Sequence, residues 1–473
     1  MTGGQFYIGG AWVEPHGAET VDVSNPANGA LLGRARLGDA VDADRAVAAA
    51  RAAFATWSQS PVAERIALLQ RIRVAYDAAA GAIEAHLVRE IGLTTMVARG
   101  QSAMCRAHID GALAILADYR FRQPHQGFEI AREPIGVVVA ITSWNAPVSQ
   151  MLCKAVPAIA AGCTVVVKPS ELAPLCGLLL AEALSGADVP PGVFNLLNGR
   201  GGDCGRRLVE HPDVAMVTMT GSVAGGAAVS AAAAATIKRV HLELGGKSAN
   251  VLLPDADLAR VVPQSVVGCL MNAGQVCAAP TRMIVPAERF AEVAALAVEA
   301  AGKVVVGPPD DPATTYGPMA NLAQFERAQK LVAEAIADGQ PVLFGGTGRP
   351  VGLEQGLYLA TTIFGPVAAD AAIAQTEVFG PVLCIQTYRD LDEAVAIANA
   401  TPYGLAAYVQ SADPSAARAV AARLHAGYVT VNFPGWTAAA PFGGYKQSGN
   451  GKQYGTWGFE EFLETKAIVV NEG

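Results

Sequence analysis

Short runs of β-branched residues alternate with helical stretches from residue 135 onward, and this alternation constrains the fold more than any other feature. The runs are "IGVVVAIT", "GCTVVVKPS", "GVFNLLNG" and "VAMVTMTGS". Strands that are apolar on both faces are typical of parallel sheets covered by helices. The pattern therefore predicts βαβ units in a right-handed, doubly wound parallel sheet of the α/β class.

The same alternation resumes after "VHLELGGKSANVLL" and continues to "GYVTVN", which predicts a second α/β domain. A chain of 473 residues exceeds the usual size of one hydrophobic core, so more than one domain is expected. Ahead of the first sheet, "FYIGGAWV" is interpreted as a strand, and helices are expected over Asp42–Thr56 and Val62–Glu90. The tail "KAIVVNEG" is a predicted strand without an evident partner, which indicates subunit association because lone edge strands need cover.

Charge and composition exclude several classes of function. The net charge is −8 and no run of Lys or Arg is present, so neither nucleic acid nor an anionic membrane is an expected partner. Two stretches of low charge, Ile135–Val167 and Val214–Ile237, are interrupted by Gly, Pro and polar residues and are interpreted as buried α/β segments. The first residues are not expected to act as a signal peptide, because they have neither a basic segment nor a long apolar one.

The eight cysteines are scattered, without a C-x-x-C pair, which favours a reducing cytoplasm. The seven histidines do not stand at zinc-ligand spacings beside them, so no metal site is predicted.

Nucleotide-binding signals are present but individually weak. The "GGKS" at Gly245–Ser248 fails as a P-loop, because His241 occupies the position of the first glycine. Gly221–Gly226 is a glycine-rich turn between a strand and a helix, where free N–H groups suit a phosphate or simply connect the two elements. Lys168 and Glu171 follow a buried strand and suit ribose hydroxyls, or form a solvated loop pair.

Three residues are candidates for catalysis. Glu243 ends an apolar strand before two glycines, where burial would raise the pKa of a carboxyl group towards the range of a general base. Cys277 in "NAGQVC" lies among small residues that would expose its sulfur, although free cysteines are often buried and inert. Asn145 in "SWNAP" follows a strand and is placed to donate to an oxyanion, or is an ordinary turn asparagine.

Taken together, these segments resemble the aldehyde dehydrogenase superfamily nearly from end to end. The resemblance rests on "SWNAP", "AAGCTVVVKPSE", "PPGVFNLLNG", "TGS", "LELGGKSANVL", "NAGQVC", "EVFGPVL" and "APFGGYKQSG", in the order of that family. It implies two doubly wound Rossmann-like domains, one for the cofactor and one for catalysis, plus a small β arm for oligomerisation. The implied divisions are 1–115 with 135–245 for the cofactor, 246–441 for catalysis, and 116–134 with 442–473 as oligomerisation or bridging segments.

The resemblance also implies a reaction, the oxidation of an aldehyde to the carboxylic acid. Cys277 would attack the aldehyde carbonyl to form a thiohemiacetal, and the Asn145 amide and the Cys277 backbone N–H would form the oxyanion hole. Hydride transfer would leave a thioester, which water activated by Glu243 would hydrolyse. In the implied cofactor site, Lys168 and Glu171 hold the adenosine ribose, and Gly221 and Ser222 lie beside the pyrophosphate. Glu377 and Phe379 contact the nicotinamide ribose and ring, and the groove is lined by Ile141, Trp144, Gly201 and Leu244.

The carboxylate of Glu171 should prefer ribose hydroxyls to a 2′-phosphate, so NAD is predicted as the cofactor, with NADP possible but less favoured. Ser143 stands where the family usually has proline, which is expected to loosen the turn that aims Asn145, and Met219 stands where phenylalanine is usual. The family arm implies a homodimer or homotetramer.

Two other classes compete with this interpretation. One is a cysteine-dependent esterase or thioesterase, which needs no redox step; the other is a non-catalytic binding protein on the same fold. The expected pocket segments, Val148–Leu152, Val276–Ala278 and Phe433–Ala439, are mainly apolar, with Trp436 as a pocket wall or an interface residue. This composition predicts a small-molecule substrate, an uncharged aliphatic or aromatic aldehyde.

Overall fold

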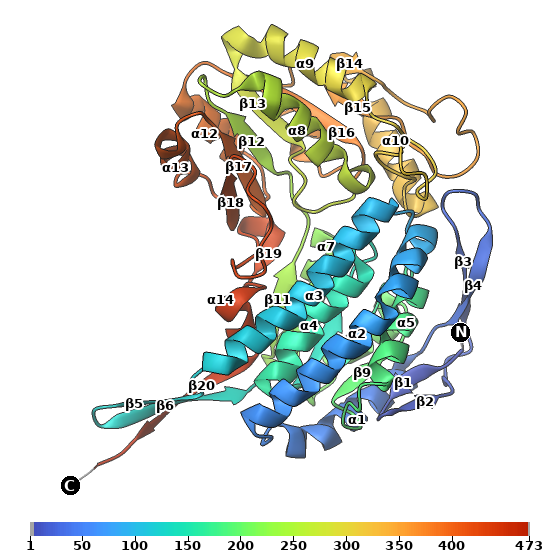
Figure 1. The fold of residues 1–473 in the computed structure, drawn as a ribbon, viewed down its shortest axis with the longest axis vertical. Helices are drawn as coiled ribbons and strands as arrows, with labels where there is room; N and C mark the ends of the chain where they lie inside the picture. The colour runs from blue at the N-terminus through green and yellow to red at the C-terminus, as the bar shows by residue number, and fades with distance from the viewer. Residues whose placement is uncertain (1–3, 472–473) are drawn as a thin grey trace.

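Two mostly parallel sheets dominate the computed structural model, which describes residues 4–471, and they occupy the two halves of the molecule in Figure 1. The predicted fold class is confirmed. Each sheet is covered by helices on both faces, and a slender β arm leaves the larger half (Figure 1).

The larger half is built on an eight-stranded sheet. Its strands, in spatial order, are β19 (Gly449–Asn450), β11 (Arg239–Glu243), β10 (Val214–Thr220), β7 (Val137–Ile141), β8 (Thr164–Lys168), β9 (Phe194–Leu196), β1 (Phe6–Ile8) and β2 (Ala11–Val13). The five from β11 to β9 are parallel. The segment "FYIGGAWV" is not one strand but the hairpin β1–β2, because Gly9 and Gly10 both have positive φ and form the turn.

Alternate residues of the central strands enter two different cores. Val138 and Ala140 pack against α2 (Val62–Glu90), α3 (Thr95–Asp118), α4 (Pro147–Ala161) and α5 (Pro174–Ser185). Val137 and Val139 pack on the opposite face, against α1 (Ala40–Trp57), α6 (Arg206–Glu210) and α7 (Val223–Ala233). Helix α1 begins two residues before the predicted start, because the Asp39 side chain caps it.

The smaller half holds a seven-stranded sheet. Its order is β14 (Val342–Phe344), β15 (Thr362–Phe364), β16 (Val382–Tyr388), β13 (Arg282–Pro286), β12 (Ala249–Leu252), β17 (Ala406–Gln410) and β18 (Tyr428–Val431). One face is covered by α8 (Leu258–Leu270), α9 (Phe290–Gly302), α10 (Leu322–Ala337) and α11 (Ala372–Gln375). The other is covered by α12 (Leu391–Asn399) and α13 (Pro414–Ala421).

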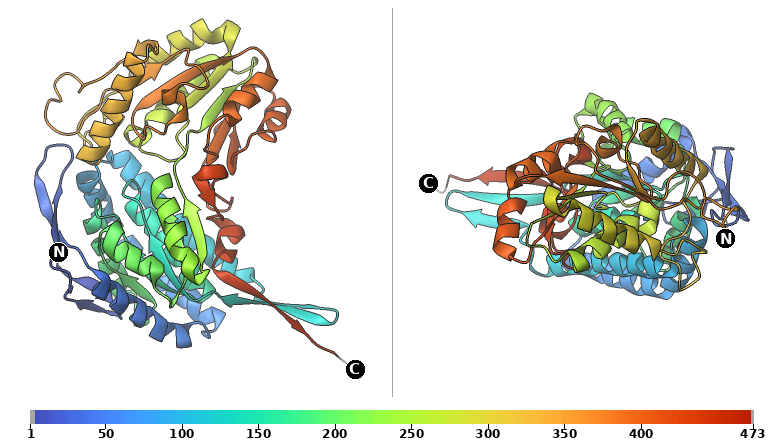
Figure 2. Two further views of the ribbon diagram at one scale, coloured as in Figure 1. Left: turned by 180° about the vertical axis from the view of Figure 1, so that it is seen from behind. Right: turned by 90° about the horizontal axis from the view of Figure 1, so that it is seen from above.

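The tail does find a partner within its own chain. Strand β20 (Leu463–Val469) pairs antiparallel with β6 (Phe128–Pro134), which forms a hairpin with β5 (Arg122–His125). These three strands make the arm, and both views in Figure 2 show it projecting from the body with the C-terminus near its tip. Local pattern does not indicate this pairing, because β6 and β20 are more than 300 residues apart, but the family resemblance implied an arm of the C-terminal strand and a hairpin.

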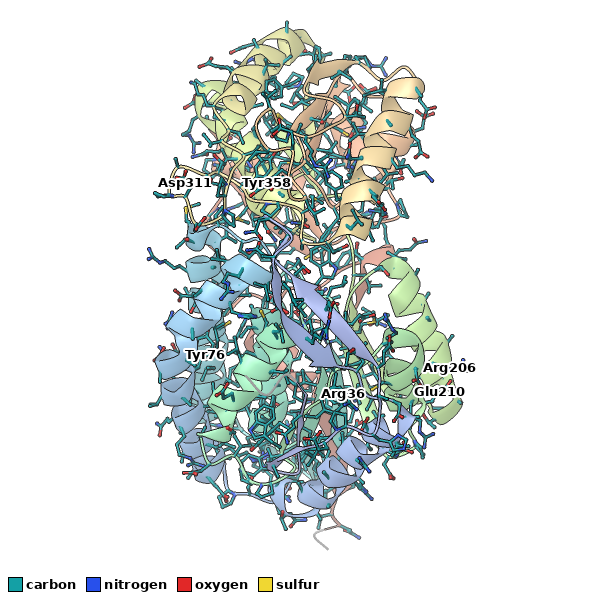
Figure 3. All side chains as sticks on the ribbon, turned by 90° about the vertical axis from the view of Figure 1, so that its right-hand side faces the viewer. Arg36, Tyr76, Arg206, Glu210, Asp311 and Tyr358 are labelled. Carbon is teal, nitrogen blue, oxygen red and sulfur yellow. The ribbon has the colours of Figure 1, made fainter. Side chains whose placement is uncertain are left out.

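Two smaller features complete the fold. The hairpin of β3 (Thr20–Ser24) and β4 (Leu31–Arg36) lies along the body, and the short helix α14 (Gly455–Glu460) precedes β20. In Figure 3, Tyr76 lies among the helices of the larger half, where it is fully buried, whereas the ion pair Arg206–Glu210 lies at the surface. Within residues 4–471, no helix is both long and apolar enough to cross a membrane.

Candidate active site

The loop that carries Cys277 follows α8 on a left-handed path. Asn272 and Ala273 have φ of 53° and 54°, and Gly274 continues with φ of 72°. A Cβ at Gly274 would overlap the carbonyl oxygen of Gly380, so this position accepts only glycine. The turn therefore brings the segment "EVFGPVL" into direct contact with "NAGQVC".

Gln275, which is fully buried, braces this loop. Its Nε2 donates to the carbonyl of Asn272 at 3.0 Å, and its Oε1 accepts from the N–H of Ala320 at 2.9 Å. Sequence reasoning did not assign a role to Gln275. Because both ends of its amide are hydrogen-bonded, the backbone leading to Cys277 is held rigidly.

Cys277 is half-buried, whereas the other seven cysteines are buried. Burial, followed by the negative charges of Glu243 and Glu377, raises the pKa of the Cys277 thiol to about 12. The thiol is therefore protonated at neutral pH, and its proton must leave during any reaction in which the sulfur acts as a nucleophile.

Between β11 and β12 the chain passes from the larger sheet to the smaller one, and this connection lies directly beside the loop of Cys277. A Cβ at Gly246 would lie 2.7 Å from the carbonyl oxygen of Cys277, and one at Gly245 would overlap the carboxylate of Glu377. The N–H of Gly246 donates to Oε1 of Glu377 at 2.9 Å. The two glycines thus permit the close approach that the sequence predicted, and the approaching groups are Glu377 and the nucleophile loop.

Glu243 ends β11 and is 3% exposed. Neither of its carboxylate oxygens has a well-formed hydrogen bond among the described residues. Burial raises the pKa of Glu243 to about 8, although the charges of Lys154 and Lys452 and the backbone N–H of Gly444 oppose the increase. His241 lies 3.9 Å away, but burial lowers its pKa to about 3, so it is neutral and does not form an ion pair. The carboxyl group is thus placed to gain and lose a proton near neutral pH.

Asn145 is held by both ends of its side-chain amide. Its Oδ1 accepts from the hydroxyl of Ser143 at 2.7 Å, and its Nδ2 donates to the carbonyl of Gln275 at 2.9 Å. The hydroxyl of Ser143 thus holds this amide by a bond that proline could not make, and the loosening of the turn itself stays a prediction. The carbonyl of Asn145 also accepts from Nε2 of Gln101 in α3, a contact that the sequence did not indicate.

Lys154 is a buried cation beside the candidate residues and was not singled out as functional. Its Nζ donates to Oγ1 of Thr220 at 2.6 Å and to Oε1 of Gln150 at 3.1 Å. Its charge lowers the pKa of Glu243. A signal was present in the sequence, because Lys154 is the one charged residue in the apolar stretch Ile135–Val167.

The candidate cofactor residues of the larger half gather at one sheet edge. The carboxyl ends of β7, β8 and β10 are adjacent, so Ile141, Lys168 and Gly221 lie in a row. Ligands of doubly wound sheets bind at this edge. Nζ of Lys168 lies 3.6 Å from the carboxylate of Glu171 and donates to the carbonyl of Gly199 at 2.6 Å.

The remaining residues of this set occupy the surrounding turns. The hydroxyl of Ser222 caps α7 by accepting from the N–H of Gly225 at 3.1 Å. Gly201 begins a single π-helical turn and has open space around it. Leu244 packs so closely on α7 that a Cβ at Gly226 would overlap its side chain.

Trp144 and Phe379 connect the two halves of the molecule. Trp144 follows β7 and Phe379 precedes β16, yet their rings meet edge to face with centroids 5.4 Å apart. Phe379 has a φ of 55°, a conformation that is uncommon outside glycine. Residues from loops that adjoin the two sheets therefore meet at the boundary between the two halves.

The predicted pocket segment Val148–Leu152 requires correction. It is not a loop but the first turn of α4, and Val148, Met151 and Leu152 are fully buried in the core. Ser149 and Gln150 lie on another side of the helix, because successive residues are rotated around its axis. There they contact His108 and Lys154.

The family of the chain follows from comparison with known proteins. A model of the aldehyde dehydrogenase family matches residues 12–468. The chain belongs to this family. Among related aldehyde dehydrogenases, it is 45% identical to a 3-succinoylsemialdehyde-pyridine dehydrogenase from a Pseudomonas species, with 99% of each chain covered.

Solved aldehyde dehydrogenase structures have the same fold throughout. The cysteine-to-alanine mutant of aldehyde dehydrogenase C from Pseudomonas syringae, in complex with NAD+ and octanal, gives a TM-score of 0.98 at 50% identity, covering 99% of this chain and 97% of that one. The aldehyde dehydrogenase of Mycobacterium tuberculosis in complex with NAD+ gives 0.97 at 35% identity, covering 99% and 98%. The protein is thus an aldehyde dehydrogenase, and its reaction class is the oxidation of aldehydes.

Proposed function

We propose that this enzyme oxidises an uncharged aliphatic or aromatic aldehyde to the carboxylic acid and reduces NAD, with Cys277 as nucleophile and Glu243 as general base. The observation that carries the proposal is the convergence of three groups from separate segments. Asn145 is hydrogen-bonded to the loop of Cys277, and Glu243 ends β11 three residues before Gly246, which lies against the carbonyl of Cys277.

In the first step, the ionised carboxylate of Glu243 takes the proton of the Cys277 thiol as Sγ bonds to the aldehyde carbon, and Glu243 releases this proton to solvent before the last step. The carbonyl oxygen becomes an oxyanion, which accepts hydrogen bonds from the Asn145 amide and the backbone N–H of Cys277. Because Ser143 fixes Oδ1 of Asn145 and one N–H of Nδ2 donates to the carbonyl of Gln275, only the second N–H of Nδ2 is available to the oxyanion. Removal of one such donor typically costs about 3 kcal/mol of transition-state stabilisation.

The residues at the sheet edge fit a dinucleotide. Glu171 lies near Lys168, where its carboxylate would accept ribose hydroxyls, and the open surroundings of Gly201 and the start of α7 leave room and N–H groups for a pyrophosphate. NAD bound there supplies an acceptor for the hydride that leaves the carbon bonded to Cys277. The negative charge of Glu171 disfavours a 2′-phosphate, so we propose NAD over NADP.

In the last step, Glu243 takes a proton from water, and the resulting hydroxide attacks the thioester carbon. The bond to sulfur then breaks, and the carboxylic acid and the free thiol are released. A carboxyl group with a pKa of about 8 suits this role, because it returns its proton readily near neutral pH.

The arm is proposed to join subunits into a homodimer or homotetramer. Its strands expose apolar side chains, with Phe128 38%, Ile468 36% and Val469 79% exposed. Exposed apolar edges of this kind need cover. We assign the larger half to cofactor binding and the smaller half to the nucleophile.

NADH formation across short, long, aromatic and acidic aldehydes tests the proposal. Wild-type enzyme should turn over uncharged aldehydes, Cys277→Ala should not, and Cys384→Ala, which changes a buried cysteine of β16, should remain active. An unchanged rate in Cys277→Ala contradicts the mechanism, and a strong preference for an acidic semialdehyde contradicts the substrate class. Ester hydrolysis without any NADH formation would favour a cysteine esterase instead.

A further inference from the structure

Lys452 is a half-buried cation close to the proposed general base, and sequence reasoning did not assign it a role. It lies in the segment between β19 and α14. Its backbone N–H donates to the carboxylate of Glu461 at 3.0 Å, and its Nζ donates to the carbonyl oxygen of Gly443 at 2.8 Å. The Nζ atom also lies 5.1 Å from the centroid of the Tyr445 ring. The side chain of Lys452 is therefore held at both of its ends.

The backbone around this hydrogen bond is tightly packed. Phe442 and Gln453, the neighbours of the two bonded residues, exchange backbone hydrogen bonds of 2.8 and 2.6 Å. A Cβ at Gly427 would overlap the carbonyl oxygen of Gly443 and would lie 2.9 Å from Nζ of Lys452, so only glycine fits there. This packing leaves the carbonyl group of Gly443 little freedom to turn away from the ammonium group.

The peptide group that accepts from Lys452 also adjoins the proposed base. A Cβ at Gly443 would lie 2.8 Å from Oε1 of Glu243 and 3.1 Å from Cδ of Lys452, so the carboxylate and the lysine side chain are close neighbours. The backbone N–H of Gly444 faces the carboxylate and lowers the pKa of Glu243. The peptide between Gly443 and Gly444 is trans, so its C=O and its N–H point in opposite directions. One peptide group therefore lies between the cation and the base.

We propose that Lys452 is a positioning residue for the general base, which it holds through the peptide between Gly443 and Gly444. Its ammonium group fixes the carbonyl end of that peptide, and the N–H end then keeps the Glu243 carboxylate in place for proton transfer. A cation on the carbonyl oxygen also polarises the peptide, which strengthens the hydrogen bond that the N–H can donate. The inference rests on the proposed function, in which Glu243 is the base.

Other charged and titratable groups also face Glu243. Lys154 of α4 is the second cation that lowers the pKa of Glu243. His241, in the same strand, is neutral, because burial lowers its pKa to about 3. Burial also lowers the pKa of Lys452, although the charges of Glu243 and Glu461 oppose the decrease. Three further groups interact with the carboxylate and are protonated at neutral pH, because burial raises the pKa of each: Cys153, Cys277 and Tyr454.

The pH dependence of kcat/KM for octanal, measured as NADH formation, tests the role of Lys452, because it reports the ionisation of the base in the free enzyme. Lys452→Met keeps an unbranched side chain but removes the charge and the donor, and Lys452→Arg restores both. Lys446→Met is the matched control. Nζ of Lys446 also donates to backbone carbonyls, at 2.7 and 3.0 Å, but these belong to Asn399 and Thr401 and not to the peptide beside Glu243.

In Lys452→Met the carboxylate loses a neighbouring cation and a polarised donor, so kcat/KM should rise with pH about one pH unit later than in wild type. This shift should lower kcat/KM about tenfold at pH 7, whereas near pH 10 the two enzymes should agree within about threefold. The profile of Lys452→Arg should stay within about 0.3 pH unit of wild type, and Lys446→Met should match wild type. Because an apparent pKa does not depend on how much enzyme folds, a low yield of Lys452→Met does not obscure the shift.

An unshifted profile in Lys452→Met overturns the inference, and so does an equal loss of kcat/KM at every pH, which a purely structural role would produce. A shift of the same size in Lys446→Met overturns it as well. Glu243→Gln separates this inference from the proposed function. If Glu243→Gln matches wild type, Glu243 is not the base and both fail. If Glu243→Gln is inactive while the Lys452→Met profile is unshifted, only the role of Lys452 fails.

Discussion

Replacing Glu243 with glutamine should stabilise the fold at alkaline pH while it removes the proposed base. Burial holds the pKa of this carboxyl group at about 8, against an ordinary value of 4.5. At pH values between these two, the Glu243 side chain is ionised in the unfolded chain but protonated in the folded protein, so the free energy of unfolding falls as the pH rises. It falls by about 1.4 kcal/mol for each pH unit and by about 5 kcal/mol over the whole range.

Glutamine does not ionise in either state, so Glu243→Gln escapes this loss. The variant should match wild type near pH 4.5 and exceed it by about 5 kcal/mol above pH 8. Neither oxygen of Glu243 has a well-formed hydrogen bond among residues 4–471, and the backbone N–H of Gly444, which lowers the pKa of Glu243, can donate equally to the amide oxygen of glutamine.

Glu90 provides a matched control, because it is an equally buried glutamate with the opposite surroundings. Its oxygens accept from the N–H groups of Leu175 and Cys176 at 3.0 and 2.9 Å, at the start of α5. The amide nitrogen in Glu90→Gln would face one of these donors. That substitution should destabilise the protein by about 1–3 kcal/mol.

Urea unfolding followed by tryptophan fluorescence at pH 5, 7 and 9 measures both effects. The stability gain of Glu243→Gln over wild type should grow steadily across the three values, whereas Glu90→Gln should be less stable than wild type. A Glu243→Gln protein that is less stable than wild type at pH 9 would refute the reasoning, because the native carboxylate would then have to be stabilised by its surroundings.

Three further substitutions follow from the site. Ser143→Ala removes the hydrogen bond to Oδ1 of Asn145 and should lower kcat about tenfold with KM unchanged, and equal kcat values in a steady-state comparison would contradict this orienting role. Gly274→Ala introduces a clash with Gly380 at a φ of 72° and should reduce activity about 100-fold and lower the melting temperature; a variant as active and as stable as wild type would show that the loop can move. Glu171→Gln removes a negative charge and should raise kcat/KM with NADP about tenfold relative to NAD, measured as NADPH formation, and an unaltered ratio would assign the discrimination elsewhere.

The architecture was predictable because local sequence patterns indicate its strands and helices. The run "IGVVVAIT" is apolar at successive positions, which predicts a strand covered by helices on both faces of a parallel sheet, and β7 is buried on both faces. Helix α2 was predicted with its observed ends for the same reason, since its apolar residues recur at helical spacing.

What could not be predicted depends on contacts between distant segments. The ring of Tyr454 stacks between those of His108 in α3 and Phe442, and no single stretch of sequence indicates that these three rings meet. The pairing of β6 with β20 is likewise absent from local pattern, although the family resemblance implied an arm. The pocket segment at Val148–Leu152 was misinterpreted because apolar residues of a helix and of a pocket wall have the same composition.

The hydrogen bond from Asn145 to Gln275 spans 130 residues and links the two halves of the molecule. Each sheet can form from its own strands, and domains generally fold as units. The catalytic centre cannot form within one half, because its residues come from both halves and meet only after the two have docked. During refolding, secondary structure and core packing should therefore return first, and turnover should appear last, leaving an interval in which the chain is structured yet inactive.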